Sequence, residues 1–324
     1  MEKISPLNSF DQIKLLADAR RLAILRLLMA APATLSQLGH ALGRHPAWVQ
    51  HHLKALESGG LVEIAETRLS AGVLEKFYRA KAAGFFLQEM ILPQGEISTL
   101  VFSGSHDLAL EALAERLKPH LRLLTLPVGS LDGLINLRQG LCQVCGAHIL
   151  DENGEYNLPT VRRIFPEQNV HLMTLATRVQ GLMVAPGNPL GIRSLEDLTR
   201  AGLTFLNRNP GSGTRIWLER ELARLGLPVS AIHGYENYVP THSQAAEAIR
   251  RSQADVSLGI QAAAWNQGIG FLPLFEERYD LIIPLAYQVT LAPLLDALQT
   301  ANFRHAAESL TGYTTTHSGE QISL

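Results

Sequence analysis

The chain has 324 residues, with 28 Lys or Arg against 30 Asp or Glu, which gives a formal net charge of −2. This length exceeds that of a DNA-binding domain alone and allows two or three folding units with their own apolar cores. No apolar run reaches the roughly 18 residues of a membrane span, and the N-terminus lacks a secretory-signal pattern. Two cysteines are too few for a disulfide framework. We therefore expect a soluble, cytoplasmic protein.

Charge is distributed unevenly along the chain. Residues 1–90 hold eleven Lys and Arg against eight Asp and Glu, whereas the remainder holds seventeen against twenty-two. The asymmetry favours a modestly basic DNA-binding domain over 1–90 joined to a domain over 91–324 that need not touch nucleic acid.

The first 90 residues show a helix-turn-helix pattern followed by a hairpin. Apolar residues between positions 7 and 28 predict one long opening helix, which Pro32 follows. Thr34 is placed to cap a short second helix, and Gly43 makes the turn into a third. Two β-like runs at 61–65 and 74–79, with Gly72 between them, are typical of a wing.

The third helix has a buried and a polar face. Val49, Leu53 and Leu56 recur at i, i+4 and i+7, while Gly59-Gly60 ends the helix. The opposite face is expected to read DNA in the major groove. The predicted DNA-binding residues are Arg44, His45, Trp48, Gln50, His51 and Lys54.

The run Val-Gln-His-His-Leu-Lys at 49–54, followed by Gly-Leu-Val at 60–62, resembles the winged-helix domain of ArsR-like bacterial regulators over about residues 10–82. The resemblance implies a homodimer on double-stranded operator DNA, with the opening helix, 7–28, as the expected dimer surface. The cysteines of metal-sensing members are absent from 35–38, which argues against metal sensing. Two alternatives stay open: a zinc site on the histidines of this region, and an interaction module that no longer binds DNA.

From residue 97 onward, short apolar strands alternate with amphipathic helices, which predicts parallel βαβ units. Three strands end in small polar loops that open a helix, and residues 241–243 are a fourth candidate loop of this kind. The free amides and helix dipoles of such loops suit an anion, although ordinary helix caps would look the same. The predicted ligand-binding residues in these loops are Ser103, Gly104, Ser105, Ser130, Ser212, Gly213, Thr214, Arg215, Thr241 and His242.

The runs Ser-Gly-Ser-His-Asp at 103–107, Cys-Gly-Ala-His at 145–148 and Asn-Arg-Asn-Pro-Gly-Ser-Gly-Thr-Arg at 207–215 resemble the periplasmic-binding-protein-like domain of some regulators and molybdopterin-biosynthesis proteins. The resemblance implies an α/β protein in which the winged helix precedes a type II, two-lobed domain. Lobe I would take about 97–179 and 270–324, and lobe II about 180–269, with the ligand between them. Related transport receptors hold molybdate or tungstate through hydroxyls and amides, so a tetrahedral oxyanion is the expected effector.

Several side chains keep two interpretations. Arg215 or Arg208 would pair with an anion, or Arg215 would brace its own helix, which we favour. His148 and His242 are ligand donors or supporting groups. Cys142 and Cys145 with His148 form a C-x2-C-x2-H pattern without a fourth zinc ligand, so buried packing is favoured over a metal site.

Catalysis is not predicted. Ser105, His106 and Asp107 are adjacent at a helix start and point in different directions, and no Walker, HExxH or GxSxG motif occurs. The sequence therefore predicts a ligand-responsive transcriptional regulator with no cofactor and no metal. Two alternatives remain: a regulator that senses a small organic carboxylate or amino-acid-like compound near Tyr235 and Tyr238, and a cytoplasmic binding protein or enzyme of molybdenum-cofactor metabolism.

Overall fold

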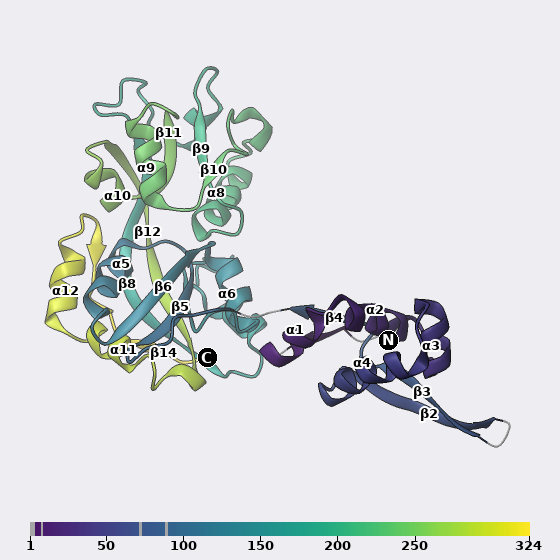
Figure 1. Cartoon of the computed structure of the whole chain (residues 1–324). Coiled ribbons are helices and arrows are strands. Elements are labelled where there is room, and N and C mark those ends of the chain that lie inside the picture. Colours follow the sequence, from purple (N-terminus) through teal and green to yellow (C-terminus); the bar gives the residue numbers. More distant parts are fainter. Residues whose placement is uncertain (1–3, 8, 71–72, 88–89) are drawn as a thin grey trace. The chain divides into compact units, whose positions relative to one another are not determined.

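The structure is a computed structural model that describes residues 4–7, 9–70, 73–87 and 90–324. The chain divides into two compact units, Met1–Ile91 and Leu92–Leu324, called here the N-terminal and C-terminal units. Figure 1 labels their helices and strands. Among the described residues, no helix is both long and apolar enough to cross a membrane.

The N-terminal unit is a bundle of helices followed by a hairpin. Its apolar core includes Ile24 and Leu25 of the second helix, with Val49, Leu53 and Leu56 of the fourth, all at most 2% exposed. The elements are β1 (Ile4–Leu7), α1 (Phe10–Leu16), α2 (Ala19–Ala30), α3 (Leu35–Leu42), α4 (Pro46–Ser58), β2 (Val62–Ser70), β3 (Val73–Ala80) and β4 (Gly84–Leu87).

The single opening helix predicted over 7–28 is wrong, because α1 and α2 are separate helices. The helix is interrupted at Asp18, whose backbone is extended. Asp18 is the N-cap of α2, and its carboxylate accepts a hydrogen bond from Arg20 N at 2.9 Å. Aspartate is favoured at such caps because its side chain replaces the missing helical acceptor. Apolar periodicity continues through this break, and so the pattern alone conceals it.

The predicted boundaries of the next two helices are confirmed. Thr34 and Gln37 form a reciprocal capping box at the start of α3, and Gly43 ends it with a left-handed φ of 62°. Pro46 begins α4, after which Gly60 has a φ of 73°. The wing strands β2 and β3 pair in antiparallel fashion and extend beyond the predicted runs, while the turn expected at Gly72 lies outside the described residues.

The C-terminal unit is built on a ten-stranded sheet whose main path is β10-β9-β11-β8-β12-β7-β5-β6. The strands are β5 (Ser98–Gly104), β6 (Leu121–Pro127), β7 (Val144–Ala147), β8 (Val170–Val184), β9 (Phe205–Arg208), β10 (Tyr238–Val239), β11 (Val256–Ile260), β12 (Gly270–Pro284), β13 (Tyr313–Thr314) and β14 (Gln321–Ile322). The helices are α5 (Leu108–Leu117), α6 (Ser130–Arg138), α7 (Leu158–Ile164), α8 (Gly213–Arg224), α9 (His242–Arg250), α10 (Gln261–Asn266), α11 (Ala292–Leu298) and α12 (Ala301–Glu308), with short 3-10 turns at Leu195–Thr199, Val229–Ala231 and Leu285–Tyr287.

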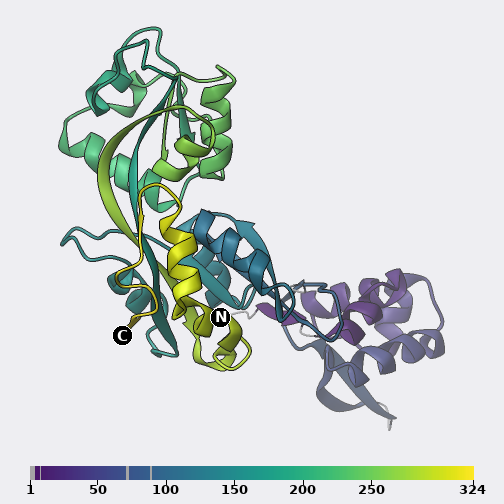
Figure 2. The ribbon, with the colours of Figure 1, turned by 90° about the vertical axis from the view of Figure 1, so that its left-hand side faces the viewer.

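Two long strands connect the two halves of this sheet. β8 and β12 have 15 residues each and pair in antiparallel register from Gly270 opposite Val184 to Pro284 opposite Val170. The strands β5, β6 and β7 with α5 to α7, α11 and α12 form the first lobe. The strands β9 to β11 with α8 to α10 form the second lobe (Figure 2).

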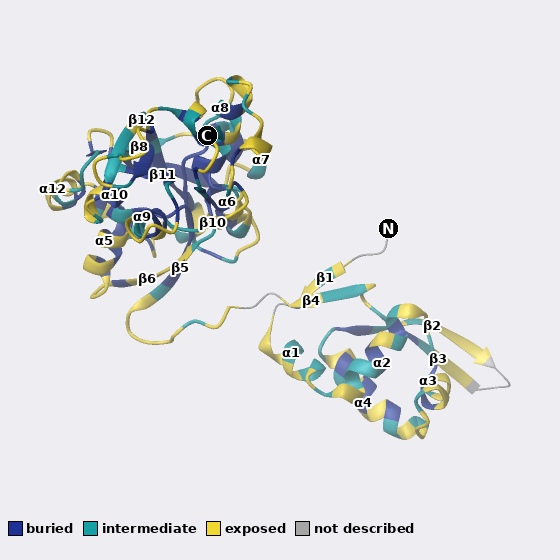
Figure 3. Cartoon of the chain, turned by 90° about the horizontal axis from the view of Figure 1, so that it is seen from above, coloured by how far each residue is buried: buried dark blue, intermediate teal, exposed yellow. Residues whose placement is uncertain are grey.

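The remaining pairings confirm the predicted α/β class. β5 is parallel to both β6 and β7, and β9 is parallel to both β10 and β11, as βαβ units require. The central strands β8 and β11 are almost wholly buried, whereas the helices on the outside keep one exposed face (Figure 3).

Candidate functional site

The fourth helix of the N-terminal unit presents a polar surface opposite its buried stripe. Arg44, His45, Gln50, His51 and Lys54 are all exposed. Gln50 and Lys54 make no hydrogen bond or ion pair with any residue that the structure describes, so their donors stay available to a partner.

The N-terminal end of this face is partly used by the protein itself. His45 caps α4, where its Nδ1 accepts a hydrogen bond from Ala47 N at 3.2 Å. The Trp48 ring is only half-buried and packs edge-on against His52, with the two ring centroids 4.5 Å apart. The Arg44 guanidinium lies 5.5 Å from the centroid of the Trp48 ring. Burial lowers the pKa of His52. Trp48 and His45 therefore shape the start of the helix as well as lying at its surface.

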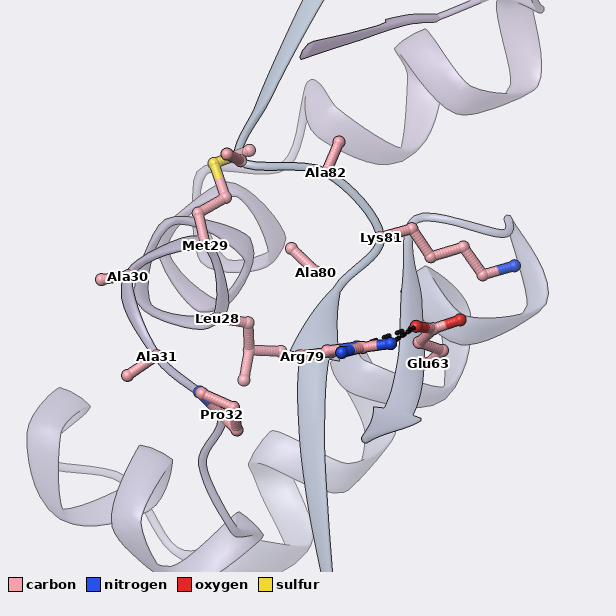
Figure 4. A pocket seen from close by; sticks show the side chains of 11 residues that line it. Leu28, Met29, Ala30, Ala31, Pro32, Glu63, Arg79, Ala80, Lys81 and Ala82 are labelled. Carbon is pink, nitrogen blue, oxygen red and sulfur yellow. Dashed lines mark hydrogen bonds and ion pairs between the residues drawn. The ribbon is translucent and has the colours of Figure 1, made fainter. Parts of the chain in front are cut away.

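The N-terminal unit also has a surface hollow of about 470 Å³ between the end of α2 and the base of the wing (Figure 4). Arg79 and Glu63 form an ion pair of 2.7 Å on its wall, as the dashed lines show. Most of the remaining wall consists of alanine and aliphatic side chains. Because Arg79 already has its counter-charge, this arginine offers little to an anion in the hollow.

In the C-terminal unit, polar side chains converge where the two lobes meet. Ser105 follows β5 and Ser130 begins α6, and their hydroxyl oxygens lie 2.9 Å apart. His148 follows β7, and its Nε2 lies 3.0 Å from Ser105 Oγ, while its backbone N donates to Ser130 Oγ at 3.2 Å. We call Ser105, Ser130 and His148 the serine-histidine cluster; all three residues are at most 2% exposed.

Side chains from both crossing strands support this cluster. Glu277 of β12 places Oε2 2.6 Å from His148 Nδ1 and Oε1 2.6 Å from Arg178 Nε. Arg178 of β8 also pairs with Asp107 at 2.7 Å, and Gln180 donates to both Glu277 and Thr214. Burial opposes the charge of Glu277, but its neighbours His148 and Arg178 outweigh burial and hold the pKa of Glu277 below its ordinary range.

A second arginine lies beside this network without a carboxylate partner among the described residues. Arg208, at the end of β9, is 1% exposed. It donates to the Val239 and Pro240 carbonyls and to Nδ1 of His242, all neutral acceptors. Burial, together with the charge of Arg178, lowers the pKa of Arg208 to about 9.

The two lobes contact each other directly around these groups. Asn209 of the second lobe donates to the Val128 carbonyl of the first at 2.5 Å, and His242 N lies 3.4 Å from His106 Nδ1. Gly213 begins α8 against His148, where a Cβ would lie 2.5 Å from the histidine carbonyl. Only glycine allows this approach, and so the lobes are closed on one another along what we call the interlobe site.

Comparison with known proteins identifies both units. Residues 111–299 match the PBP superfamily domain, and residues 18–63 match the bacterial regulatory protein, arsR family. A Bacillus subtilis relative, uncharacterized protein YvgK, is 32% identical over 233 residues, covering 71% of this chain and 75% of that protein.

The chain belongs to the PBP superfamily. Its N-terminal unit contains an ArsR-family helix-turn-helix, and this pairing supports a ligand-binding transcriptional regulator rather than an enzyme. A putative phosphate transporter substrate-binding protein from Clostridium perfringens, solved with bound phosphate, aligns with a TM-score of 0.48 at 12% identity, over 70% of this chain and 99% of that one. The substrate-binding domain of a putative molybdenum transporter from Clostridium difficile aligns with a TM-score of 0.42 at 14% identity, over 67% of this chain and 98% of that one.

The PBP domain brings only some of the predicted ligand residues together. The predicted residues that lie at the interlobe site are Ser105, Ser130, Gly213, Thr214 and His242.

The other predicted residues have contacts of their own within the protein. Ser103 accepts from Asn136, and Gly104 lies against the Gly146 backbone. Ser212 and Thr241 cap α8 and α9. Arg215 pairs with Glu219 at 2.9 Å and covers the Tyr235 ring at 4.9 Å, which is the bracing role favoured from the sequence.

The cysteines of the PBP domain take no part in the site. Cys142 and Cys145 are both buried free thiols, and burial raises the pKa of Cys142 to about 12. His148 turns away from them toward Ser105 and Glu277. A protonated, buried thiol is a poor metal ligand and a poor nucleophile, so these residues act in packing.

Sequence reasoning missed Arg178, Gln180 and Glu277, which hold the interlobe site together from the crossing strands. Arg178 and Gln180 lie in β8, where Arg178 is the one Lys, Arg, Asp or Glu, whereas Glu277 belongs to the charged run from Glu276 to Asp280 in β12. A charged residue that is buried in a sheet must be paired. Arg178 was therefore a signal available in the sequence, but the run around Glu277 did not show which of its charges would be buried.

Proposed function

We propose that this chain is a ligand-responsive transcriptional regulator in which α4 binds operator DNA and the interlobe site binds a small anionic effector. The observation that carries the proposal is Arg208, a buried guanidinium that lacks a counter-charge among the described residues. Burying an unpaired charge is costly, and an anion between the lobes removes that cost. Closure around the anion would then alter the operator affinity of the winged helix.

We propose a tetrahedral oxyanion as the effector. Molybdate and tungstate are the members of this class that the sequence led us to expect. The alternative, an organic carboxylate or amino-acid-like ligand, was suggested by the apolar faces that Tyr235 and Tyr238 would offer it. Tyr235 is instead covered by Arg215 and donates to Glu219, while Tyr238 is 53% exposed. These contacts favour the oxyanion.

We further propose that the regulator works in the cytoplasm as a homodimer. A winged helix reads one half-site, and two copies reach half-sites roughly 34–36 Å apart, one turn of DNA. The dimer surface expected on a single opening helix would be shared between α1 and α2.

The test begins with duplexes selected from a random-sequence library by the full-length protein. Operator affinity is then measured by fluorescence anisotropy with and without molybdate, tungstate, phosphate and sulfate. The proposal requires at least one anion to change operator affinity, by about 1–3 kcal/mol if the coupling is typical. If one of the anions binds the protein but operator affinity is the same with and without every anion, ligand-responsive regulation is refuted.

The rival function is a binding protein or enzyme of molybdenum-cofactor metabolism that keeps the helix-turn-helix for partner contact. The double substitution Gln50→Ala and His51→Ala separates the two, because both side chains are exposed on α4. If the chain is a regulator, the double variant loses operator binding and keeps its anion affinity. If the chain has the rival function, the unmodified protein selects no operator sequence from the library.

A further inference from the structure

The hydrogen positions in the serine-histidine cluster follow from its partners. His148 Nδ1 lies 2.6 Å from Glu277 Oε2, too close for two lone pairs to face each other, although the angle is not that of a regular hydrogen bond. Glu277 is a carboxylate and only accepts, so Nδ1 carries the proton. Burial lowers the pKa of His148 despite Glu277, which leaves the ring neutral with a single proton. Its Nε2 is therefore an acceptor, and Ser105 Oγ donates to it over 3.0 Å.

The same reasoning fixes Ser130. The hydroxyl proton of Ser105 goes to His148, so across the 2.9 Å contact Ser130 is the donor and Ser105 the acceptor. Ser130 also accepts from His148 N. Both hydroxyl protons are consumed inside the cluster. The two serines, expected from the sequence to donate to an anion, therefore have only lone pairs left to offer.

Two amides add further acceptors to the interlobe site. Gln180 Nε2 donates to Glu277 and Thr214, and Asn209 Nδ2 donates to the Val128 carbonyl, which fixes each amide's orientation. Gln180 Oε1 and Asn209 Oδ1 are buried and have no hydrogen-bond partner within the described part of the chain. A buried acceptor without a donor is costly.

The site also holds unused donors. Arg208 donates into His242 Nδ1, so the proton of that ring is on Nε2. His242 Nε2 and Arg178 Nη2 are buried, and neither has a hydrogen-bond partner among the residues described. Together with the uncompensated charge of Arg208, they suit the oxygens of an anion, while the acceptors require a ligand that also brings a hydrogen.

We propose that the effector is an oxyanion that carries its own proton, of the phosphate and arsenate class, and that the serine-histidine cluster selects it. This inference rests on the proposed function and narrows its ligand. A fully deprotonated oxyanion such as sulfate, molybdate or tungstate would meet the lone pairs of Ser105, Ser130 and Gln180 without a hydrogen to share. A site built around a particular hydrogen bond discriminates strongly against a ligand that lacks it.

The test is isothermal titration calorimetry on the full chain near pH 7.5 with phosphate, arsenate, sulfate, molybdate and tungstate. Phosphate and arsenate keep a proton under these conditions and the other three do not. We expect both to bind at least about tenfold more tightly than any of the three. Equal or tighter binding of molybdate, tungstate or sulfate overturns this inference and leaves the proposed oxyanion regulator intact. Binding of none of the five overturns both.

A substitution checks that the cluster is responsible. His148→Gln replaces a ring of fixed polarity with an amide that can turn either its nitrogen or its oxygen toward Ser105, so the phosphate-to-sulfate affinity ratio should fall at least several-fold. The matched control is His171→Gln, a buried histidine in the first-lobe part of β8, which should keep the wild-type ratio. An unchanged ratio in a folded His148→Gln protein contradicts the role of the cluster. Should that variant fail to fold, the selectivity of the unmodified chain still decides.

Discussion

The polar face of α4 and the interlobe site are both proposed to bind anionic partners, but they are built in opposite ways. On α4, exposed side chains such as Gln50 and Lys54 come from one helix and make no hydrogen bond or ion pair within the described part of the chain. At the interlobe site, buried groups such as Arg178 and Glu277 come from several strands and loops and hold one another. Binding and folding are therefore separable on the helix and coupled in the site.

Removing the paired arginine should show that coupling most strongly. Arg178→Met leaves Asp107 and Glu277 as buried carboxylates without their cation, so the C-terminal unit should lose about 3–5 kcal/mol of unfolding free energy. Urea unfolding followed by circular dichroism measures this loss. Arg162→Met, at an exposed position of α7, is the matched control and should change stability by less than about 0.5 kcal/mol. Similar values for both would mean that Arg178 does not hold the site.

Removing the unpaired arginine should separate binding from stability within the same site. Arg208→Met deletes a charge that only neutral groups contact, so the cost in stability should be well below that of Arg178→Met. Affinity for the oxyanion should fall by about 2–5 kcal/mol, at least roughly 30-fold, because a buried charged contact is truncated. Calorimetry of the variant checks this, and unchanged anion affinity would remove Arg208 from the ligand site.

Substitutions on α4 should affect binding alone. Gln50→Ala should weaken operator binding by about 1–3 kcal/mol if its amide reads a base, and Lys54→Ala should lower the salt dependence by about one phosphate contact. Unfolding free energy should change by less than about 0.5 kcal/mol in both. Fluorescence anisotropy across a salt series gives both the operator affinity and its salt dependence. A stability loss as large as the binding loss would show that this face is part of the fold.

The smallest expected effect is on pH dependence. Burial lowers the pKa of His242 well below its ordinary value of 6.5, with the charge of Arg208 acting in the same direction. The unfolded chain therefore binds this proton first, and stability falls as pH drops below 6.5, by at most about 1.4 kcal/mol per pH unit. His242→Gln should reduce that slope between pH 6.5 and 5 in thermal unfolding. A slope equal to that of the unmodified chain would contradict a neutral, buried His242.

The contrast between the two regions also explains how far sequence reasoning reached. A recognition helix is local, so Val49, Leu53 and Leu56 give its buried face directly. The helix starts follow from Thr34, which caps α3, and from Pro46, the first residue of α4. One failure in the N-terminal unit, the break at Asp18, occurred because a polar residue at a cap leaves apolar periodicity unchanged.

The interlobe site could be predicted only in outline. Its loops follow strands, and their placement at one sheet edge follows from the βαβ pattern. The partners of those loops come from β8 and β12, where Arg178 and Glu277 are 99 residues apart in sequence. Register between distant strands is set by tertiary packing, so no local pattern shows that Glu277 meets His148. For the same reason, the sequence did not show whether Ser212 and Thr241 cap their helices or contact a ligand.

The pairing of β8 with β12 also determines the order in which the protein can form. The N-terminal unit has an apolar core of its own, so it can fold as soon as it leaves the ribosome. The PBP domain must wait until β12, Gly270–Pro284, has been synthesised and can pair with β8, and such non-local pairing is slow. During synthesis, a nascent chain therefore has a complete winged helix before it has a complete sensor.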